Sequence, residues 1–385
     1  MHSRLRSPIS FRSALSPAPP RGRARPKGRH VRADPSVLPP QDDAHRSEID
    51  RNGRQDHPER FALDPPLVGR QAQRSPIHRH APDLNGPADG SGQPAQIDGA
   101  GMRLTISHRT AYRYARPVAL HPHRMMLHPR GDHDLRVVTA NLACSPDATL
   151  DWAQDVFGNL VATATFQAPA AELVITSQVV ADQLSAAWPV LRIAPGAHSF
   201  PFAYSAQEIA DLGALRAAAP AGPQDDVGSW ARAFVMGPPT DTLSLLKDIN
   251  AGILGAVAYR VRDEEGTQTG AETLAKASGS CRDLAALFIE ATRHLGFGAR
   301  AVSGYLFDPD APVSDAGTTH AWAEVYLPGA GWVAFDPTHR RMGGANLIPV
   351  AVGGGLAAIA PISGGYSGAP EDFLGMEVAV RVTAG

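Results

Sequence analysis

Hydrophobic and polar residues alternate from Met102 onward, and this alternation predicts a region built from strands. Residues 102–108 alternate as a half-buried strand does, and strand-like runs follow at 135–142, 160–166 and 173–180. Residues 155–159 have the composition of a turn between two of these runs. Pro117 lacks an N–H for a strand ladder, so we expect it at an edge or a strand start. Short strands at this spacing predict an antiparallel sandwich or sheet over residues 102–184.

Helical spacing replaces alternation farther along the chain. Ser205 can cap a short helix over 206–216, and Thr240 or Asp241 can cap a longer one. After a cluster of turn residues at 278–280, apolar residues at 284, 287, 288, 291 and 295 mark the buried face of a helix that stops at Gly296. The runs 299–306, 321–327 and 331–336 predict strands, the last two joined as a hairpin through 328–330.

Residues 1–101 lack such periodicity and differ in composition. They hold 16 of the 36 basic residues, 11 of the 38 acidic residues and 15 of the 34 prolines. Such a composition predicts a disordered segment, because it buries too little apolar surface to offset the entropy of ordering. Two origins stay open: a true disordered tail, or a start assigned too far upstream of Met102. An organelle transit peptide is a third, weaker reading.

Composition and charge exclude several classes of protein. The formal net charge of −2 argues against a dedicated nucleic-acid binder. No run of about 18 apolar residues is present, which argues against a membrane-spanning helix. Two cysteines, Cys144 and Cys281, are too few for a disulfide framework. We therefore expect a cytoplasmic protein with neither a nucleic-acid nor a membrane partner.

Cys281 is the first candidate for chemistry, because it falls in the first turn of the helix that starts after residue 280. Unpaired N–H groups and the helix dipole favour a thiolate there, which makes the side chain a nucleophile near neutral pH. The alternative is a buried structural cysteine, since free cysteine is often buried. Cys144 lies in a predicted strand without a helix terminus, so we expect it to be structural.

The predicted hairpin adds a base and an acid. If Leu327 pairs with Gly331 or Trp332, Asp336 lies opposite a residue two positions after His320, so the two side chains share a face. An aspartate bonded to one imidazole nitrogen fixes the tautomer and leaves the other nitrogen for the sulfur. The alternative is an ordinary strand histidine and a turn aspartate before proline.

The residues around these three resemble the bacterial transglutaminase-like family. The resemblance rests on four blocks in family order: 279–285 (Gly-Ser-Cys-Arg-Asp-Leu-Ala), 295–305 (Leu-Gly-Phe-Gly-Ala-Arg-Ala-Val-Ser-Gly-Tyr), 319–327 (Thr-His-Ala-Trp-Ala-Glu-Val-Tyr-Leu) and 331–338 (Gly-Trp-Val-Ala-Phe-Asp-Pro-Thr). Residues 102–180 resemble the β-rich domain that precedes this core. The resemblance implies that Cys281 is the nucleophile, His320 the base and Asp336 the orienting acid.

The expected fold is therefore α+β: a papain-like transglutaminase core preceded by an antiparallel β-domain and a disordered N-terminal segment. We expect the disordered segment at 1–101, the β-rich domain at 102–184, a connecting helical region at 185–239, the catalytic core at 240–345 and C-terminal strands at 346–385.

The chain also departs from the family pattern. Leu284 stands where members more often have an aromatic residue, and residues 352–356 replace a Gly-Arg-Asp-Tyr-like run. These departures from the family pattern concern substrate binding more than they concern the three reactive residues. No tryptophan or glutamine stands just upstream of Cys281, so its backbone N–H is the expected oxyanion donor.

Other clusters predict no cofactor and no metal site. We expect His108, His121, His123, His128 and His133 to lie on a solvated strand face, because carboxylate and cysteine partners are sparse around them. Glycines 353–355 lack the Lys-Ser/Thr of a phosphate loop. The acidic residues at 225–226 and 263–265 are read as solvated charge; calcium stays open there, although EF-hand spacing is absent.

Two functions remain from different classes. The first is a cysteine-dependent acyl-transfer enzyme acting on peptide or protein amide bonds. The second is a catalytically idle transglutaminase-like module that binds a peptide or protein partner through the same groove. The presence of all three residue types favours the enzyme. Hydrolysis and transamidation differ only in whether water or an amine accepts the acyl group, so both stay open.

Overall fold

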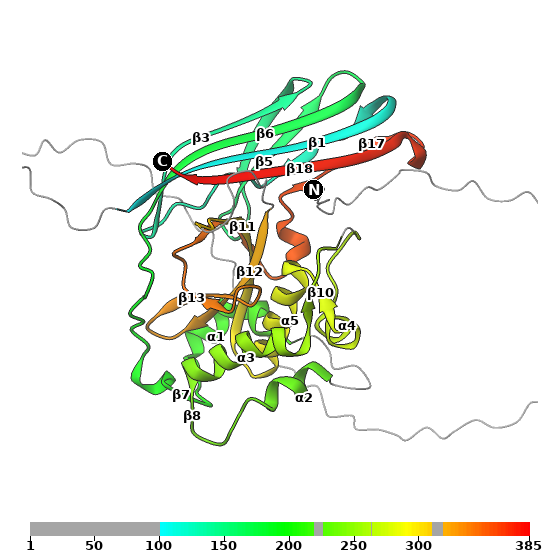
Figure 1. Cartoon of the computed structure of the whole chain (residues 1–385). Helices are drawn as coiled ribbons and strands as arrows, with labels where there is room; N and C mark the ends of the chain where they lie inside the picture. The colour runs from blue at the N-terminus through cyan, green and yellow to red at the C-terminus, as the bar shows by residue number, and fades with distance from the viewer. Residues whose placement is uncertain (1–100, 219–225, 263, 310–318) are drawn as a thin grey trace, which may run out of the picture. The chain divides into compact units, whose positions relative to one another are not determined.

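The computed structural model describes residues 101–218, 226–262, 264–309 and 319–385, all of which belong to one compact unit (Figure 1). The expectations of disorder and of a misassigned start for residues 1–100 lie outside this range. So do two of the acidic residues considered for calcium, Asp225 and Asp263. Among the described residues, no helix is long and apolar enough to cross a membrane.

Residues 102–183 and 362–384 form two antiparallel sheets. One has the order β17 (Tyr366–Ser367), β1 (Met102–Leu120), β6 (Ala170–Gln183), β3 (Leu135–Ser145), with β18 (Phe373–Ala384) also paired to β1. The other has the order β16 (Ile362–Ser363), β2 (His123–Met125), β5 (Leu160–Phe166), β4 (Ala148–Gln154). The antiparallel β-rich region predicted from alternation is therefore present, and the turn at 155–159 joins β4 to β5 as expected.

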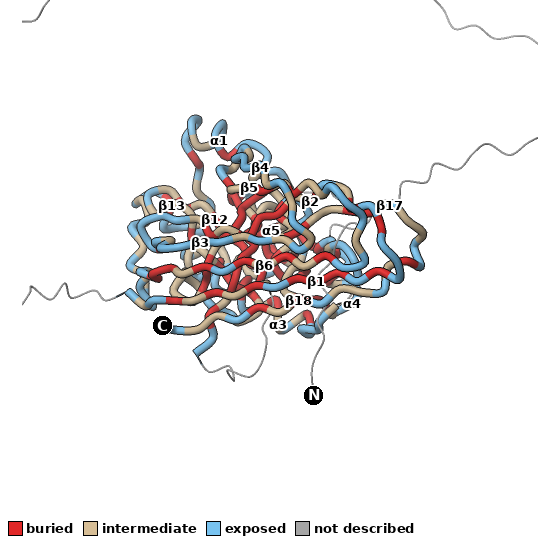
Figure 2. Tube along the Cα trace, turned by 90° about the horizontal axis from the view of Figure 1, so that it is seen from above, coloured by how far each residue is buried: buried red, intermediate tan, exposed pale blue. Residues whose placement is uncertain are grey.

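Alternation along β1 determines which of its side chains are buried. Leu104 and Ile106 are fully buried, and buried and exposed segments alternate along the strands of this sheet in Figure 2. β1 pairs with β6 on one side and β18 on the other, so it is not an edge strand. Pro117 lies where the register with β6 breaks between Arg113 and Val118, and this interruption removes the need for its missing N–H.

The second part combines helices with a five-stranded antiparallel sheet. The sheet has the order β14 (Arg341–Met342), β13 (Gly331–Asp336), β12 (His320–Leu327), β11 (Gly298–Leu306), β15 (Leu347–Gly353). The helices are α1 (Ala206–Leu212), α2 (Asp226–Arg232), α3 (Thr242–Ala256), α4 (Gly270–Lys276) and α5 (Cys281–His294). The chain is thus of the α+β class, as predicted.

Short elements connect these parts. β7 (Ser199–Phe200) pairs with β8 (Thr240–Asp241), and β9 (Ala258–Tyr259) pairs in parallel with β10 (Ser278–Gly279). The 3-10 helices are η1 (Pro195–Ala197), η2 (Gly213–Arg216), η3 (Leu356–Ile359) and η4 (Pro370–Asp372). The helix expected over 206–216 is α1 followed directly by η2, and Asp241 rather than Thr240 caps α3.

Helix α5 packs on the sheet with the face that its apolar spacing predicts. Leu284, Leu287 and Phe288 are fully buried, and α5 lies against β12 and β11 (Figure 1). The ring of Phe288 stacks on that of Phe335 in β13, with 5.3 Å between the ring centroids. Phe288 belongs to the helix that starts at Cys281, and Phe335 belongs to the strand that ends at Asp336. Their contact therefore helps to fix the start of this helix relative to the end of this strand.

Residues 347–385 contribute strands to both sheet regions. β15 pairs with β11 in the helix-bearing part, whereas β18 runs along β1 from Tyr114 to Leu104. Asn159, fully buried in the turn before β5, adds a further link: its amide donates to the Val352 carbonyl at 2.7 Å and accepts from the Val352 N–H at 2.8 Å. The Asn159 side chain therefore links the two regions through its hydrogen bonds to the backbone of Val352.

Candidate active site

His320 and Asp336 meet across the β12–β13 hairpin. Leu327 pairs with Gly331 and Ala323 with Phe335, so the register expected from the sequence is confirmed. Nε2 of His320 lies 2.9 Å from Oδ2 of Asp336. Both side chains are buried, at 7% and 2% exposure, which strengthens the hydrogen bond by excluding water.

Cys281 lies at the first position of α5, where a buried carboxylate anchors the chain. Asp283 accepts hydrogen bonds from both the N–H and the hydroxyl of Ser280, each at 2.8 Å. It also accepts from the Gln268 N–H at 2.8 Å and forms an ion pair with Arg262 at 3.0 Å. Asp283 therefore has a structural role: it fixes the start of α5, which is where the sulfur of Cys281 lies.

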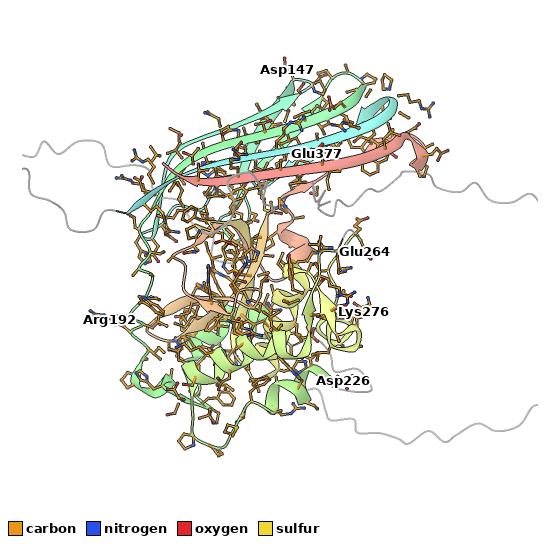
Figure 3. All side chains as sticks on the ribbon, in the orientation of Figure 1. Asp147, Arg192, Asp226, Glu264, Lys276 and Glu377 are labelled. Atoms are coloured by element: carbon orange, nitrogen blue, oxygen red, sulfur yellow. The ribbon has the colours of Figure 1, made fainter. Side chains whose placement is uncertain are left out.

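The residue after the cysteine attaches a loop to the same helix turn. The guanidinium of Arg282 donates to the backbone carbonyls of Gly266 at 2.8 Å and Glu264 at 2.6 Å. Figure 3 labels Glu264 on this loop, where its own side chain is exposed. The side chain of Gln268 in the same loop donates to the Ser278 carbonyl at 3.0 Å.

The sulfur of Cys281 is hydrogen-bonded to the His320 side chain and to the backbone of Ala321. Because Nε2 of His320 is directed to Asp336, Nδ1 is the nitrogen left for the sulfur. The structure therefore brings together all three residues that the sequence singled out, in the linear order sulfur, imidazole, carboxylate.

The electrostatics favour an ion pair between sulfur and imidazole. Burial opposes ionisation of Cys281, but its hydrogen bond to His320 and the charge of His320 outweigh burial, so the pKa of the thiol is lowered. Burial likewise opposes charging of His320, and Asp336 overcomes it, raising the pKa of His320 to about 10. Despite burial, His320 and His339 hold the pKa of Asp336 below its ordinary range. The three shifts together favour the form of the site that holds thiolate, imidazolium and carboxylate.

Cys144 has the opposite environment. It lies in β3 and is unpaired, and burial raises the pKa of its thiol to about 11. A thiol with such a pKa is protonated at neutral pH and is a poor nucleophile. Its structural environment thus matches the expectation drawn from its place in a strand.

His339 also belongs to the site, although the sequence patterns did not single it out. Its Nδ1 lies 2.8 Å from Oδ2 of Asp336, the same oxygen that contacts His320. The N–H of Thr338 donates to the other oxygen, Oδ1, at 3.0 Å. A histidine three residues after a strand-ending aspartate is the available signal, because a tight turn returns its side chain to the aspartate.

Tyr259 was also missed as a neighbour of the site. It lies on β9 opposite Gly279, two residues before the cysteine. Burial raises the pKa of Tyr259 to about 12, and the negative charges of Cys281 and Asp336 act in the same direction. The phenol therefore keeps its proton at neutral pH and is a hydrogen-bond donor on this side of the site.

Among the described residues, one cluster has the spacing of a metal site, and it is not the one considered from the sequence. Ligand atoms of His320, Asp336 and His339 lie within 4.8 Å of one another, a donor set that suits zinc. Both imidazoles are directed to the same carboxylate oxygen, so hydrogen bonds already satisfy the cluster.

The expectation that five histidines lie on a solvated strand face is wrong: two of them are buried, and the other three, His121, His128 and His133, lie outside the strands. His108 and His123 are buried, at 1% and 0% exposure. Burial lowers the pKa of His108 to about 4, and its ring nitrogens contact the hydroxyls of Tyr305 at 3.2 Å and Thr110 at 2.9 Å. His108 lies on the same face of β1 as Leu104 and Ile106, so alternation alone indicated its burial.

Two family models match parts of this chain. Residues 104–182 match the bacterial transglutaminase-like N-terminal region, and residues 228–337 match the transglutaminase-like superfamily. An uncharacterized protein of Mycobacterium tuberculosis is 28% identical over 279 residues, covering 68% of this chain and 87% of its own. An uncharacterized protein of Mycobacterium leprae is 27% identical over 301 residues, covering 73% of this chain and 98% of its own.

A solved structure shares the fold. It is a protein of Cytophaga hutchinsonii provisionally named as a cysteine protease, with a TM-score of 0.56 and 18% sequence identity, covering 74% of this chain and 92% of its own. The match over residues 228–337 contains Cys281, His320 and Asp336, and the preceding match contains β3 and most of β1 and β6. The chain therefore resembles the transglutaminase-like superfamily over its core and the bacterial transglutaminase-like N-terminal region over the strands that precede it.

Proposed function

We propose that the protein is a cysteine-dependent acyl-transfer enzyme that acts on peptide or protein amide bonds through Cys281, His320 and Asp336. The observation that carries the proposal is the combined environment of the sulfur: a lowered pKa, a helix N-terminus and a hydrogen bond to a charged imidazole. A purely structural cysteine requires none of these features.

In the first half-reaction, the Cys281 thiolate attacks the carbonyl carbon of the amide and forms a C–S bond. The backbone N–H of Cys281 stabilises the negative charge that develops on the carbonyl oxygen. The imidazolium of His320 then donates its Nδ1 proton to the amide nitrogen, the C–N bond breaks, and the amine leaves. A thioester and a neutral imidazole remain.

In the second half-reaction, Nδ1 of His320 removes a proton from the incoming nucleophile, which attacks the thioester carbon. The C–S bond breaks and the thiolate returns beside the imidazolium. Throughout the cycle, Asp336 accepts the Nε2–H of His320 and so keeps Nδ1 directed to the sulfur. Water as the nucleophile gives hydrolysis, and a primary amine gives transamidation.

Intact-mass analysis tests this proposal. The protein is incubated with a mixture of peptides, with and without a primary amine, and both the protein and the peptides are weighed. We expect a thioester adduct on Cys281, followed by cleaved or amine-modified peptide. Cys281→Ala should abolish both products, whereas Cys144→Ala should retain them.

The alternative, a catalytically idle module, predicts a different result. Such a module would retain peptides without adduct or product, and Cys281→Ala would bind them as wild type does. Peptide retention by both proteins with no change in peptide mass would therefore favour the binding module over the enzyme.

A further inference from the structure

We infer that His339 is a positioning residue that holds the Asp336 carboxylate for the proposed reaction, so that the site contains four members rather than three. The inference rests on the proposed function, because it concerns how the Cys281–His320 pair is kept in its reactive state. It begins from the unusual hydrogen bonding of one carboxylate oxygen.

Oδ2 of Asp336 accepts hydrogen bonds from two imidazoles at once. His320 approaches through Nε2 at 2.9 Å and His339 through Nδ1 at 2.8 Å, while Oδ1 accepts the Thr338 N–H at 3.0 Å. The rings of the two histidines meet edge to face, with 5.3 Å between centroids. Both oxygens of a carboxylate that is 2% exposed are therefore held by defined donors.

This arrangement determines the tautomer of each ring. An ionised carboxylate only accepts hydrogen bonds, so His320 must present Nε2–H and His339 must present Nδ1–H. Without the second donor, the buried Oδ2 would have one partner fewer, and the carboxylate could turn about its χ2 bond, which is a broad torsion. His339 restricts that turn and keeps Oδ2 in line with His320.

The two histidines differ in exposure, which separates their roles. The His320 side chain is 7% exposed and contacts Cys281, whereas that of His339 is 31% exposed and contacts the carboxylate. His339 therefore acts through Asp336 and not on the reacting atoms. Its required property is an N–H donor at the δ position of the side chain.

That requirement can be tested with a pair of close substitutions. In asparagine the amide nitrogen occupies the δ position, so His339→Asn retains the donor. Glutamine places its amide one bond farther along, so His339→Gln retains size and polarity but misplaces the donor. His339→Ala removes the donor. Arg340, which is exposed with a φ of 53°, is the matched control in the same turn, as Arg340→Gly.

The measurement is the rate of alkylation of Cys281 by iodoacetamide from pH 4 to pH 10, with the melting temperature recorded for each protein. We expect His339→Ala and His339→Gln to react at least about tenfold more slowly at pH 6 and to shift the profile to higher pH, because a loosened Asp336 stabilises the imidazolium less. His339→Asn and Arg340→Gly should follow the wild-type profile within about threefold.

The outcomes distinguish the two proposals. A reactive wild-type Cys281 whose profile is unchanged in His339→Ala and His339→Gln would overturn the role of His339 and leave the proposed function standing. Slow reaction of His339→Asn, equal to that of His339→Ala, would also overturn it, since the retained donor should restore the profile. If wild-type Cys281 reacts no faster than Cys144, the proposed function fails and the role of His339 fails with it. If His339→Ala does not fold, the comparison of Asn with Gln decides.

Discussion

His320 and Asp336 are 16 residues apart in sequence, yet Nε2 of His320 lies 2.9 Å from Oδ2 of Asp336, because the two residues occupy diagonal positions on paired strands. Ala323 pairs with Phe335, which places Asp336 opposite the residue two positions after His320. The hairpin therefore orients the imidazole without any contribution from a distant loop. Helix α5 then needs only to bring its first residue to the free nitrogen.

Selective alkylation of Cys281 is the first prediction. Burial raises the pKa of Cys144 to about 11, whereas His320 lowers that of Cys281 against the effect of burial. Iodoacetamide at pH 6 should therefore modify Cys281 at least about 100-fold faster than Cys144. Peptide mapping after timed quenching measures both rates in one sample. Similar rates would mean that the thiol is not activated.

The second prediction concerns Asp336→Asn. Asparagine retains the shape of the side chain but can present an amide N–H to His320, which leaves the imidazole in the unproductive tautomer. We expect the rate of acyl-enzyme formation to fall about 10–1000-fold, less than in a serine triad because a thiolate paired with imidazolium relies less on the third member for proton abstraction. Rapid-quench measurements at several pH values check this. A rate within twofold of wild type throughout would reduce the site to a dyad.

The third prediction follows from the lowered pKa of Asp336. A group whose pKa is lower in the folded than in the unfolded protein adds stability that is complete above its ordinary pKa of 3.8 and is lost as the pH falls toward the folded value. Asp336→Asn should lower the free energy of unfolding by about 3 kcal/mol at pH 6, since it leaves His320 without its counter-charge. The difference from wild type should shrink between pH 4 and pH 2.

Urea unfolding at each pH measures this difference. The exposed Asp151 in β4, changed to asparagine, is the control and should give a small and nearly constant difference. A gap between wild type and Asp336→Asn that stays constant down to pH 2 would contradict the linkage.

The fourth prediction tests the link between the N-terminal strands and the core sheet. Asn159→Ala removes the amide that bonds both the N–H and the carbonyl of Val352 and accepts from Arg130 at 2.8 Å. The free energy of unfolding should fall by about 2–4 kcal/mol, because buried donors and acceptors lose their partners. The exposed Asn141, changed to alanine, should cost no more than about 0.5 kcal/mol in the same chemical denaturation.

The fifth prediction uses two glycines. A Cβ on Gly304, which pairs with His320, would lie 2.1 Å from the Ile348 carbonyl oxygen and 2.8 Å from Trp322, so Gly304→Ala should lower the free energy of unfolding by at least about 2 kcal/mol. Gly255 lies in α3 with nothing within 4 Å of its Cβ position, so Gly255→Ala should raise stability by about 0.5–1 kcal/mol. Thermal and urea unfolding of both variants check the opposite signs.

Local patterns in the sequence predicted much of the fold. The strands at 160–166 and 331–336 have the expected bounds, α5 begins after residue 280, and the hairpin register follows from its short turn. These features depend on side-chain periodicity, capping residues and turn chemistry, all of which act within a few residues. The placing of His320 and Asp336 together belongs to this class, since one hairpin brings them together.

Only the tertiary structure decided the rest. Strand β18 pairs with β1 across more than 250 residues, and periodicity cannot specify which strand edge a distant segment joins, because backbone N–H and C=O groups are the same on every edge. The role of Asp283 as the anchor for Arg262, Gln268 and Ser280 needed the loop before α4 to be in place. His339 became part of the site because a turn returns its ring to Asp336. The sequence therefore determined the reactive residue types and their local elements, whereas packing determined the pKa shifts, because those depend on burial and on contacts between distant segments.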